Sequence, residues 1–337
     1  MRPFIYFDQK RDVPFEGVRL RKNLKGALEL NNIEYVTSFL ANPDIFHTIC
    51  SLKDNQISDC HSDDVKIVAS PFFAPHDYDA KFLEKDKDGF ILTRLGALTL
   101  MGSDLIIVPS EEAKEYLSSL GVKAPIEVMT PGINLTRFHL VDELEKNVFS
   151  RYARISTNEK YFISSGDYQD FEGLKRLGYL AKANSKIRFF FVGSNSKGKL
   201  SPRDSKRLSK QYGQNITFLY LLDDDLYRSA LSGASGYLSL GDLPNHMATL
   251  EAMSAKIPVY EWRNLRFGNL SIDGQTGFVF ENIDKLNETF TKECQKPSNA
   301  TIIEAYEFAK KNSLKNLGEK LRLTYEKVLN PIGGNKQ

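Results

Sequence analysis

The sequence has few of the features that mark several large protein classes. Its 337 residues include only three cysteines, which are odd in number and lack CxxC spacing. This pattern cannot form a disulfide framework, argues against structural zinc, and favours reduced thiols. The longest apolar run, 90–101, is interrupted by Arg94 and falls short of the roughly 18 residues that a bilayer span needs. The apolar run 4–7 is also shorter than the roughly 7 to 15 residues of a secretory signal. We therefore expect a cytoplasmic protein.

Motifs of several common enzyme classes are missing as well. The sequence has no complete GxxxxGK[ST] phosphate loop, no HExxH and no GxSxG. These motifs are signatures of P-loop NTPases, zinc proteases and serine hydrolases. The acidic run 223–225 is similar to the metal-binding acids of some transferases. It precedes LYRSAL, however, and fits an N-cap followed by an acidic first helical turn. We expect no metal at this run.

The sequence does contain the composition and pattern of a two-domain α/β protein. Hydrophobic residues make up 41% and charged residues 26% of the chain, and 22 Phe and 15 Tyr supply bulk for a core. Short strand-like runs, among them 33–39, 104–109 and 161–164, alternate with helical stretches up to 129 and again from 161, a pattern typical of doubly wound parallel sheets. The segment 135–160 is polar and lacks a strong period, which places a linker there. We predict an N-terminal Rossmann-like domain at 1–145, a second at 146–312, and a C-terminal helix at 313–337.

Charge is unevenly distributed along the chain. Residues 1–145 carry 16 Lys and Arg against 23 Asp and Glu, whereas the remainder carries 29 against 20. The segment 175–210 alone has eleven Lys and Arg and one acid, Asp204. Such a field attracts nucleotide phosphates, anionic lipid headgroups or nucleic acid, although a solvated helix face is an equal alternative. A second basic cluster overlaps the first predicted helix, 16–30 (Lys10, Arg11, Arg19, Arg21, Lys22 and Lys25). It fits either a membrane-surface helix or an ordinary helix with a charged outer side.

Four stretches of the sequence form a recognisable series in register. They are NPDIFHTI at 42–49, GSDLIIVPSEEAKEYLSSLGV with IEVMTPGINLTRF between 102 and 138, NITFLYLLDDDLYRSALSGASGYLSL at 215–240, and MATLEAMSAKIPV with DGQTGFVF between 247 and 280. Together they resemble glycosyltransferase family 4, whose members are retaining enzymes of the GT-B fold. The short chain and its ending, NSLKNLGEKLRLTYEKVL, are similar to diglycosyldiacylglycerol synthases of low-GC Gram-positive bacteria. The resemblance implies two Rossmann-like domains that face each other across a cleft, a UDP-hexose donor, and neither a metal nor a cofactor.

The resemblance also implies a set of site residues. Backbone N–H groups of Ala248, Thr249 and Leu250 are expected to hold the donor diphosphate at the start of a helix, and Glu251 to bind the ribose hydroxyls. His76 resembles the histidine that faces the transferred sugar in this family.

Three glycines are candidates for close approach to a ligand. Gly166 and Gly193 lie at strand-to-helix turns, where the nucleotide would pass close to the backbone. Gly17, in the loop before the first helix, would allow an acceptor or the donor phosphate to approach. Each of these glycines could equally be a simple turn.

The sequence departs from the family pattern at two places. The first family acid falls on Leu243. Either a one-residue shift of the loop brings the neighbouring Asp242 into the site as the catalytic carboxylate, or the acid is absent. The segment that usually carries cations for the donor phosphates reads Asp170, Phe171, Glu172, and its acids would repel a pyrophosphate. Lys175, Arg176 or the basic segment up to 210 are candidates to replace the missing cations, because such charges stabilise the leaving group.

Three functions remain open on the sequence. We predict a retaining hexosyltransferase that uses a UDP-sugar and a glycolipid acceptor at the inner face of the plasma membrane. The alternative is a catalytically silent subunit that partners an active glycosyltransferase, and the missing acid and missing cations would support it. A nucleic-acid binder would use residues 175–210, but no RNA or DNA motif accompanies them. The sequence does not decide between a homodimer and other assemblies.

Overall fold

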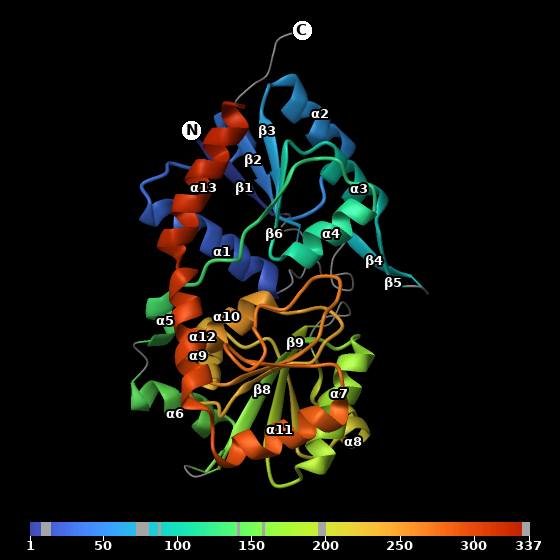
Figure 1. Ribbon diagram of the computed structural model, residues 1–337, viewed down its shortest axis with the longest axis vertical. Coiled ribbons are helices and arrows are strands. Elements are labelled where there is room, and N and C mark those ends of the chain that lie inside the picture. Colours follow the sequence, from blue (N-terminus) through green and yellow to red (C-terminus); the bar gives the residue numbers. More distant parts are fainter. Residues whose placement is uncertain are drawn as a thin grey trace. The chain divides into compact units, whose positions relative to one another are not determined.

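The computed structural model describes residues 1–7, 15–71, 81–86, 89–139, 142–156, 159–194 and 200–331. The chain divides into two compact units (Figure 1). Unit 1 consists of Met1–Gly132 and Asn312–Gln337, and unit 2 consists of Ile133–Lys311. Among the described residues, no helix is long and apolar enough to span a membrane.

Unit 1 is built on a five-stranded parallel sheet in the order β1-β2-β3-β6-β7, with a separate antiparallel hairpin of β4 and β5. Its strands are β1 (Pro3–Tyr6), β2 (Ile45–Thr48), β3 (Lys66–Ala69), β4 (Leu83–Asp86), β5 (Gly89–Leu92), β6 (Leu105–Val108) and β7 (Ile126–Val128). Its helices are α1 (Phe15–Leu30), the short 3-10 helix η1 (Phe39–Ala41), α2 (Asp54–Ser62), α3 (Arg94–Met101), α4 (Glu111–Ser119) and α13 (Leu314–Leu329). Helix α4 shows how local sequence sets an element: Ser110 caps its start by accepting the Ala113 N–H (3.0 Å), and Gly121 follows its end with φ +85°.

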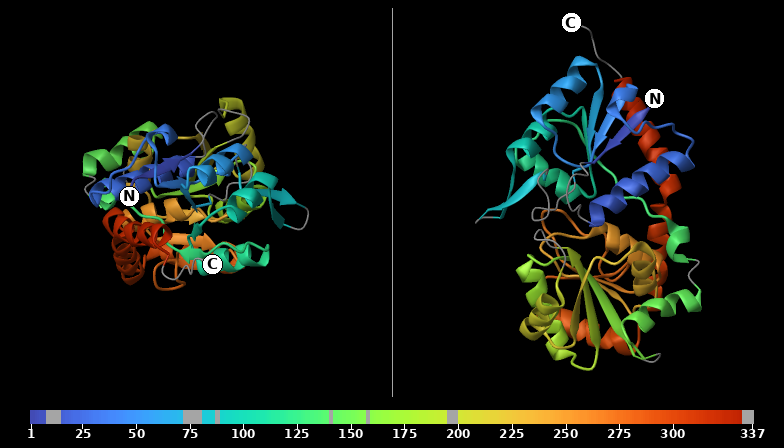
Figure 2. Two further views of the ribbon diagram at one scale, coloured as in Figure 1. Left: turned by 90° about the horizontal axis from the view of Figure 1, so that it is seen from above. Right: turned by 180° about the vertical axis from the view of Figure 1, so that it is seen from behind.

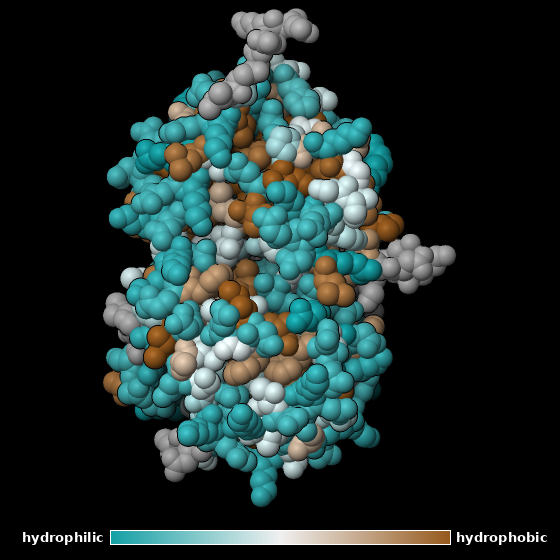
Figure 3. Space-filling model, viewed as in Figure 1, coloured by the Kyte–Doolittle hydropathy of each residue, from teal (hydrophilic) through white to brown (hydrophobic). Residues whose placement is uncertain are grey.

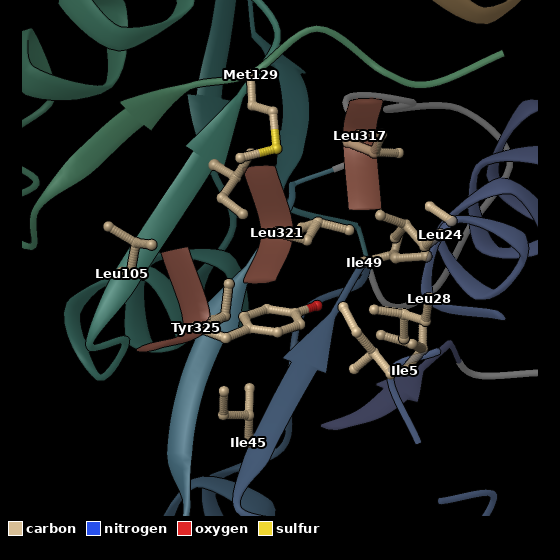
Figure 4. Close-up of a cluster of buried hydrophobic side chains, with 14 of the residues drawn as sticks. Ile5, Leu24, Leu28, Ile45, Ile49, Leu105, Met129, Leu317, Leu321 and Tyr325 are labelled. Atoms are coloured by element: carbon tan, nitrogen blue, oxygen red, sulfur yellow. The ribbon is translucent and has the colours of Figure 1, made fainter. Parts of the chain in front are cut away.

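The C-terminal helix α13 belongs to unit 1, where it packs beside α1 on one face of the sheet. Figure 4 shows Leu317, Leu321 and Tyr325 of this helix in one buried cluster with Ile45 and Ile49. The two helices approach closely at Gly318, where a Cβ atom would lie 2.2 Å from the Ala27 carbonyl oxygen. Helices α2, α3 and α4 lie on the other side of the sheet (Figure 1).

Unit 2 is built on a six-stranded parallel sheet in the order β10-β9-β8-β11-β12-β13. Its strands are β8 (Tyr161–Asp167), β9 (Arg188–Ser194), β10 (Ile216–Tyr220), β11 (Tyr237–Ser239), β12 (Val259–Trp262) and β13 (Phe278–Phe280). Its helices are α5 (Leu135–His139), α6 (Glu143–Tyr152), α7 (Phe171–Ala183), α8 (Pro202–Tyr212), α9 (Asp224–Ser232), α10 (His246–Ser254), α11 (Ile283–Gln295) and α12 (Asn299–Lys311). Helices α7, α8 and α11 form one layer and α9, α10 and α12 the other (Figures 1 and 2).

Two segments differ from the expectation. The predicted strand at 33–39 forms only one isolated bridge, from Val36 to Phe4, before η1 begins. The polar segment 135–160 contains α5 and α6, and the division between the units falls after Gly132 rather than near 145. The reason is tertiary packing: α6 lies against α9, where the Phe149 N–H donates to Ser229 Oγ (2.8 Å) and Arg228 pairs with Glu145 (2.8 Å).

Candidate functional site

The strand order of unit 2 reverses between β8 and β11, which are neighbours in the sheet. Ligands of open α/β sheets bind outside the carboxyl ends of the strands at such a switch point. Strand β8 ends here with Gly166 and Asp167, and β11 ends with Ser239. Because α7 and α10 follow these two strands directly, their amino-terminal ends lie at the same edge of the sheet. Both helix dipoles therefore make this edge favourable for an anion.

A chain of side-chain hydrogen bonds joins the two central strands to the start of α10. Ser165 Oγ lies 2.8 Å from the Tyr237 hydroxyl and accepts a bond from Asn245 Nδ2 (3.1 Å). Asn245 is also the N-cap of α10, because its Oδ1 accepts the Ala248 N–H (3.0 Å). Asn245 thus fixes where this helix begins relative to β8. Sequence reasoning overlooked Asn245, although an Asn directly before a helical pattern is a recognised N-cap signal.

Helix α10 begins at His246, and the hydrogen bonds of its first turn change the predicted donor-binding groups. The Thr249 N–H is not available for a diphosphate, because it donates to the Asn245 carbonyl oxygen (2.9 Å) as the first helical bond. Ala248 N–H donates to the Asn245 cap, and Leu250 lies beyond the first turn. The first two residues of the helix at the edge of the sheet are His246 and Met247, which were not among the predicted groups.

Two buried acids, Glu251 of α10 and Glu261 of β12, lie near the amino-terminal end of α10. Glu251 is on the second turn of α10 and only 1% exposed. Glu261, on β12, is fully buried, accepts from Thr249 Oγ1 (3.0 Å) and from the Ser271 N–H (2.8 Å), and has its pKa raised by burial. Burial also lowers the pKa of His246 to about 4, so its imidazole is neutral at physiological pH. The contact of Glu251 with ribose stays a prediction.

Gly166 and Gly193 lie side by side on β8 and β9, because they are register partners in the parallel pair. A Cβ atom on Gly193 would lie 2.7 Å from the Gly166 carbonyl oxygen, whereas one on Gly166 would be in ordinary contact with Phe191 at 3.4 Å. Gly193 is therefore required by the packing of the sheet itself. Gly166 is not, and its lack of a side chain leaves the edge of the sheet open.

Asp242 and Arg176, expected as the catalytic acid and a phosphate cation, pair with each other at 3.1 Å. Arg176 Nη1 also donates to the Leu240 carbonyl oxygen (2.9 Å), and its guanidinium lies over the Trp262 ring at 4.4 Å. Asp170 holds the same loop, because its Oδ2 accepts the Asp242 N–H (2.8 Å). Burial raises the pKa of the Asp170 carboxyl. Together, Asp170, Arg176, Asp242 and Trp262 hold the loop that follows β11 against the first turns of α7.

The other cations that the sequence suggested do not belong to the group of Arg176, Asp242 and Asp170. Lys175 is 64% exposed and pairs with Glu172 at 2.6 Å. On α1, the second basic cluster does not form one exposed surface, because Arg19 is only 3% exposed. Lys10 and Arg11 lie outside the described residues.

In unit 1, the predicted site residues are placed differently from the expectation or are not described. His76 lies outside the described residues. Gly17 is not in a loop but inside the first turn of α1, where a Cβ atom would lie 2.7 Å from the Phe7 ring. This close packing explains the glycine without a ligand.

Unit 1 also holds a buried polar group that sequence reasoning missed. His47, in the NPDIFHTI stretch at the end of β2, is fully buried. Its Nδ1 lies 2.6 Å from the Tyr325 hydroxyl and its Nε2 lies 2.7 Å from Ser70 Oγ. Burial lowers the pKa of His47 to about 3.

The described part of the chain contains no group of three or more His, Cys, Asp or Glu side chains that could hold a metal ion.

No protein-family model and no curated protein matches this sequence. Solved structures nevertheless match nearly the whole chain. HepE from Anabaena in complex with UDP-glucose is 10% identical with a TM-score of 0.69, covering 97% of this chain and 100% of its own. Sucrose-phosphate synthase from Thermosynechococcus elongatus is 15% identical with a TM-score of 0.68, covering 95% and 81%. WaaG, a glycosyltransferase involved in lipopolysaccharide biosynthesis, is 12% identical with a TM-score of 0.64, covering 98% and 100%.

These matches establish the fold. The chain has the GT-B fold of these glycosyltransferases, with two Rossmann-like domains. At such low identity, the likeness carries no substrate to this chain.

Proposed function

We propose that this protein is a retaining glycosyltransferase that moves a hexose from a UDP-sugar to a membrane glycolipid. The observation that carries the proposal is the β8/β11 switch point, where two helix starts and the open backbone at Gly166 meet at one edge of the sheet. A fold match that spans the whole of a protein solved with UDP-glucose supports the same site. The four stretches that resemble family 4 fall along both units.

The proposed chemistry needs few side chains from unit 2. In a retaining reaction of this kind, the donor phosphate is the base for the acceptor hydroxyl, and orientation supplies much of the rate. The α10 start would face the diphosphate and Glu251 the ribose. His76 would face the transferred sugar, unit 1 would take the acceptor, and no metal or cofactor would take part. The glycolipid acceptor implies peripheral association with the inner face of the plasma membrane.

Calorimetry with UDP, UDP-glucose and UDP-galactose tests the donor site, with GDP as the nucleotide control. We expect micromolar, UDP-selective binding that Glu251→Gln weakens by about tenfold or more, since a bond to a charged group contributes roughly 1.5–3 kcal/mol. Glu293→Gln is the matched control, because Glu293 is a buried acid of α11, outside the site, at 8% exposure. An equal loss in both variants would exclude a specific role for Glu251. The anomeric configuration of the product, followed by NMR, tests retention.

One observation favours the alternative of a catalytically silent subunit that partners an active glycosyltransferase. The carboxylate nearest to the missing family acid, Asp242, already pairs with Arg176 in the β11 loop. If this pair stays closed, neither group acts on a donor. The absence of nucleotide binding at about 1 mM ligand, a concentration that detects free energies as weak as roughly −4 kcal/mol, would support the silent subunit.

A further inference from the structure

Helices α7 and α8 of unit 2 carry a concentration of positive charge on their outer side. Seven cations of these helices and the turn after α7 are exposed, and we call them the cationic face: Lys175, Lys182, Lys186, Arg203, Lys206, Arg207 and Lys210. The two helices pack directly on each other at Gly178, where the Tyr212 carbonyl oxygen leaves no space for a side chain. In Figure 3, the surface over α7 and α8 at the lower right is mostly hydrophilic.

The sequence of α8 fixes which side faces outward. Ser205 Oγ donates to the Phe218 carbonyl oxygen and Ser209 Oγ to that of Ile216, both at 2.7 Å, so this side of the helix is fastened to edge strand β10. Leu208 and Tyr212 pack into the core of unit 2. Arg203, Lys206, Arg207 and Lys210 fall on the opposite side at helical spacing and are exposed. The four cations are thus held on one rigid side of the helix.

Among the described residues of α7, the turn after it and α8, two acids oppose this charge, Glu172 and Asp204. Glu172 pairs with Lys175, and Asp204 pairs with Arg207 at 3.2 Å. Seven cations against these two acids leave an excess of five positive charges. The next acid, Asp284 of α11, accepts a bond from the Tyr179 hydroxyl (2.6 Å) at the border of the face. The face therefore attracts anionic surfaces, and salt weakens that attraction.

Two exposed aromatic side chains distinguish this face from a merely solvated helix. Phe171 is 60% exposed and Tyr179 is 46% exposed. They lie four residues on either side of Lys175, on the same stripe of α7. Aromatic rings beside lysines are typical of the headgroup region of a membrane, where the rings enter the interface and the cations meet anionic lipids.

We propose that the cationic face of α7 and α8 docks unit 2 on an anionic membrane. This assignment rests on the proposed function in one respect, since a glycolipid acceptor lies in a membrane. It places the docking surface on unit 2 rather than on the basic cluster of α1, where Arg19 is buried.

Vesicle cosedimentation of the full chain tests the proposal without nucleotide or glycolipid. The vesicles contain phosphatidylcholine with about 30% phosphatidylglycerol, or phosphatidylcholine alone, at roughly 0.15 M salt. The test variant is Arg203→Gln, Lys206→Gln, Lys210→Gln. The control variant, Lys22→Gln, Lys315→Gln, Lys320→Gln, changes the net charge equally but removes exposed cations from α1 and α13.

We expect each lost cation to weaken partitioning about fivefold, so the test variant loses on the order of a hundredfold and the control variant much less. Phe171→Ser should weaken binding several-fold even at high salt. Equal loss in both triple variants, or binding that ignores phosphatidylglycerol, would overturn the proposal. So would salt-sensitive binding to a single-stranded RNA through the same three cations with no binding to vesicles. Calorimetry with UDP on both triple variants distinguishes a loss of membrane docking from a loss of the proposed donor site, because only the second would abolish nucleotide binding.

Discussion

We predict that the buried hydrogen bond between Tyr325 of α13 and His47 of β2 contributes measurably to the stability of unit 1. Tyr325→Phe removes the hydroxyl that lies 2.6 Å from His47 Nδ1 but keeps the ring, which packs edge-on against the imidazole at 5.8 Å. The ring nitrogen then has no water to replace the lost partner, because His47 is fully buried. Leaving such a group unsatisfied costs about 1–3 kcal/mol. We expect unit 1 to lose about that much stability.

The measurement has to resolve the two units separately. The only tryptophan, Trp262, lies on β12, so its fluorescence during urea unfolding reports unit 2. Hydrogen exchange of peptides from β2 and α13, followed by mass spectrometry, reports unit 1. Faster exchange in these peptides with an unchanged urea midpoint for Trp262 is the expected result.

A double-mutant cycle identifies the cause. In a His47→Leu background the Tyr325 hydroxyl has lost its imidazole partner, so removing it should cost less than about 0.5 kcal/mol. If Tyr325→Phe has the same cost in both backgrounds, or no cost in the natural sequence, the hydrogen bond does not hold α13 and the reasoning is refuted.

Three further predictions concern pH, backbone packing and the loop of unit 2. The pKa of His47 is about 3 in the folded state, below the unfolded value of about 6.5, so the unfolded state binds more protons between these values. Stability of unit 1 should therefore fall by about 2 kcal/mol from about pH 7 to about pH 5, and exchange rates of β2 in the His47→Gln variant should lack this slope. Gly193→Ala should destabilise unit 2 by about 1–3 kcal/mol in urea unfolding while Gly166→Ala costs less than about 1 kcal/mol, and equal costs would contradict the packing argument. Arg176→Met should shift the emission of the single tryptophan, because the guanidinium no longer lies 4.4 Å from its ring; an unchanged spectrum would show that this contact does not form in solution.

Much of the fold was predictable because local patterns agree with the tertiary structure. Parallel strands buried on both faces read as short apolar runs, and the runs LIIV of β6 and YFIS of β8 were found in this way. Residues 33–39 show the limit of this signal. The run has the composition of a strand, but its backbone pairs with the sheet only at Val36, and no local pattern reveals how many partners a strand will find.

The site was predictable in part. Gly166 and the helix of Glu251 were located at the carboxyl edge of the second sheet, and the structure has both elements there. The N-cap of α10 was missed, because Asn245 was not recognised as a capping residue. Arg176 and Asp242 are 66 positions apart in the chain, so their pairing could not be read from sequence spacing.

The sequence by itself determined the class of fold and the charge available to each region, because periodicity and composition are local properties. Only the tertiary structure decided which of these charges are buried, paired or exposed to solvent. Arg176 is neutralised by a carboxylate from a distant loop, Arg19 is buried, and Lys206 of α8 is exposed. The physical reason is that burial and pairing depend on neighbours that folding brings together, and these set the electrostatic strength of a charge far more than its identity does.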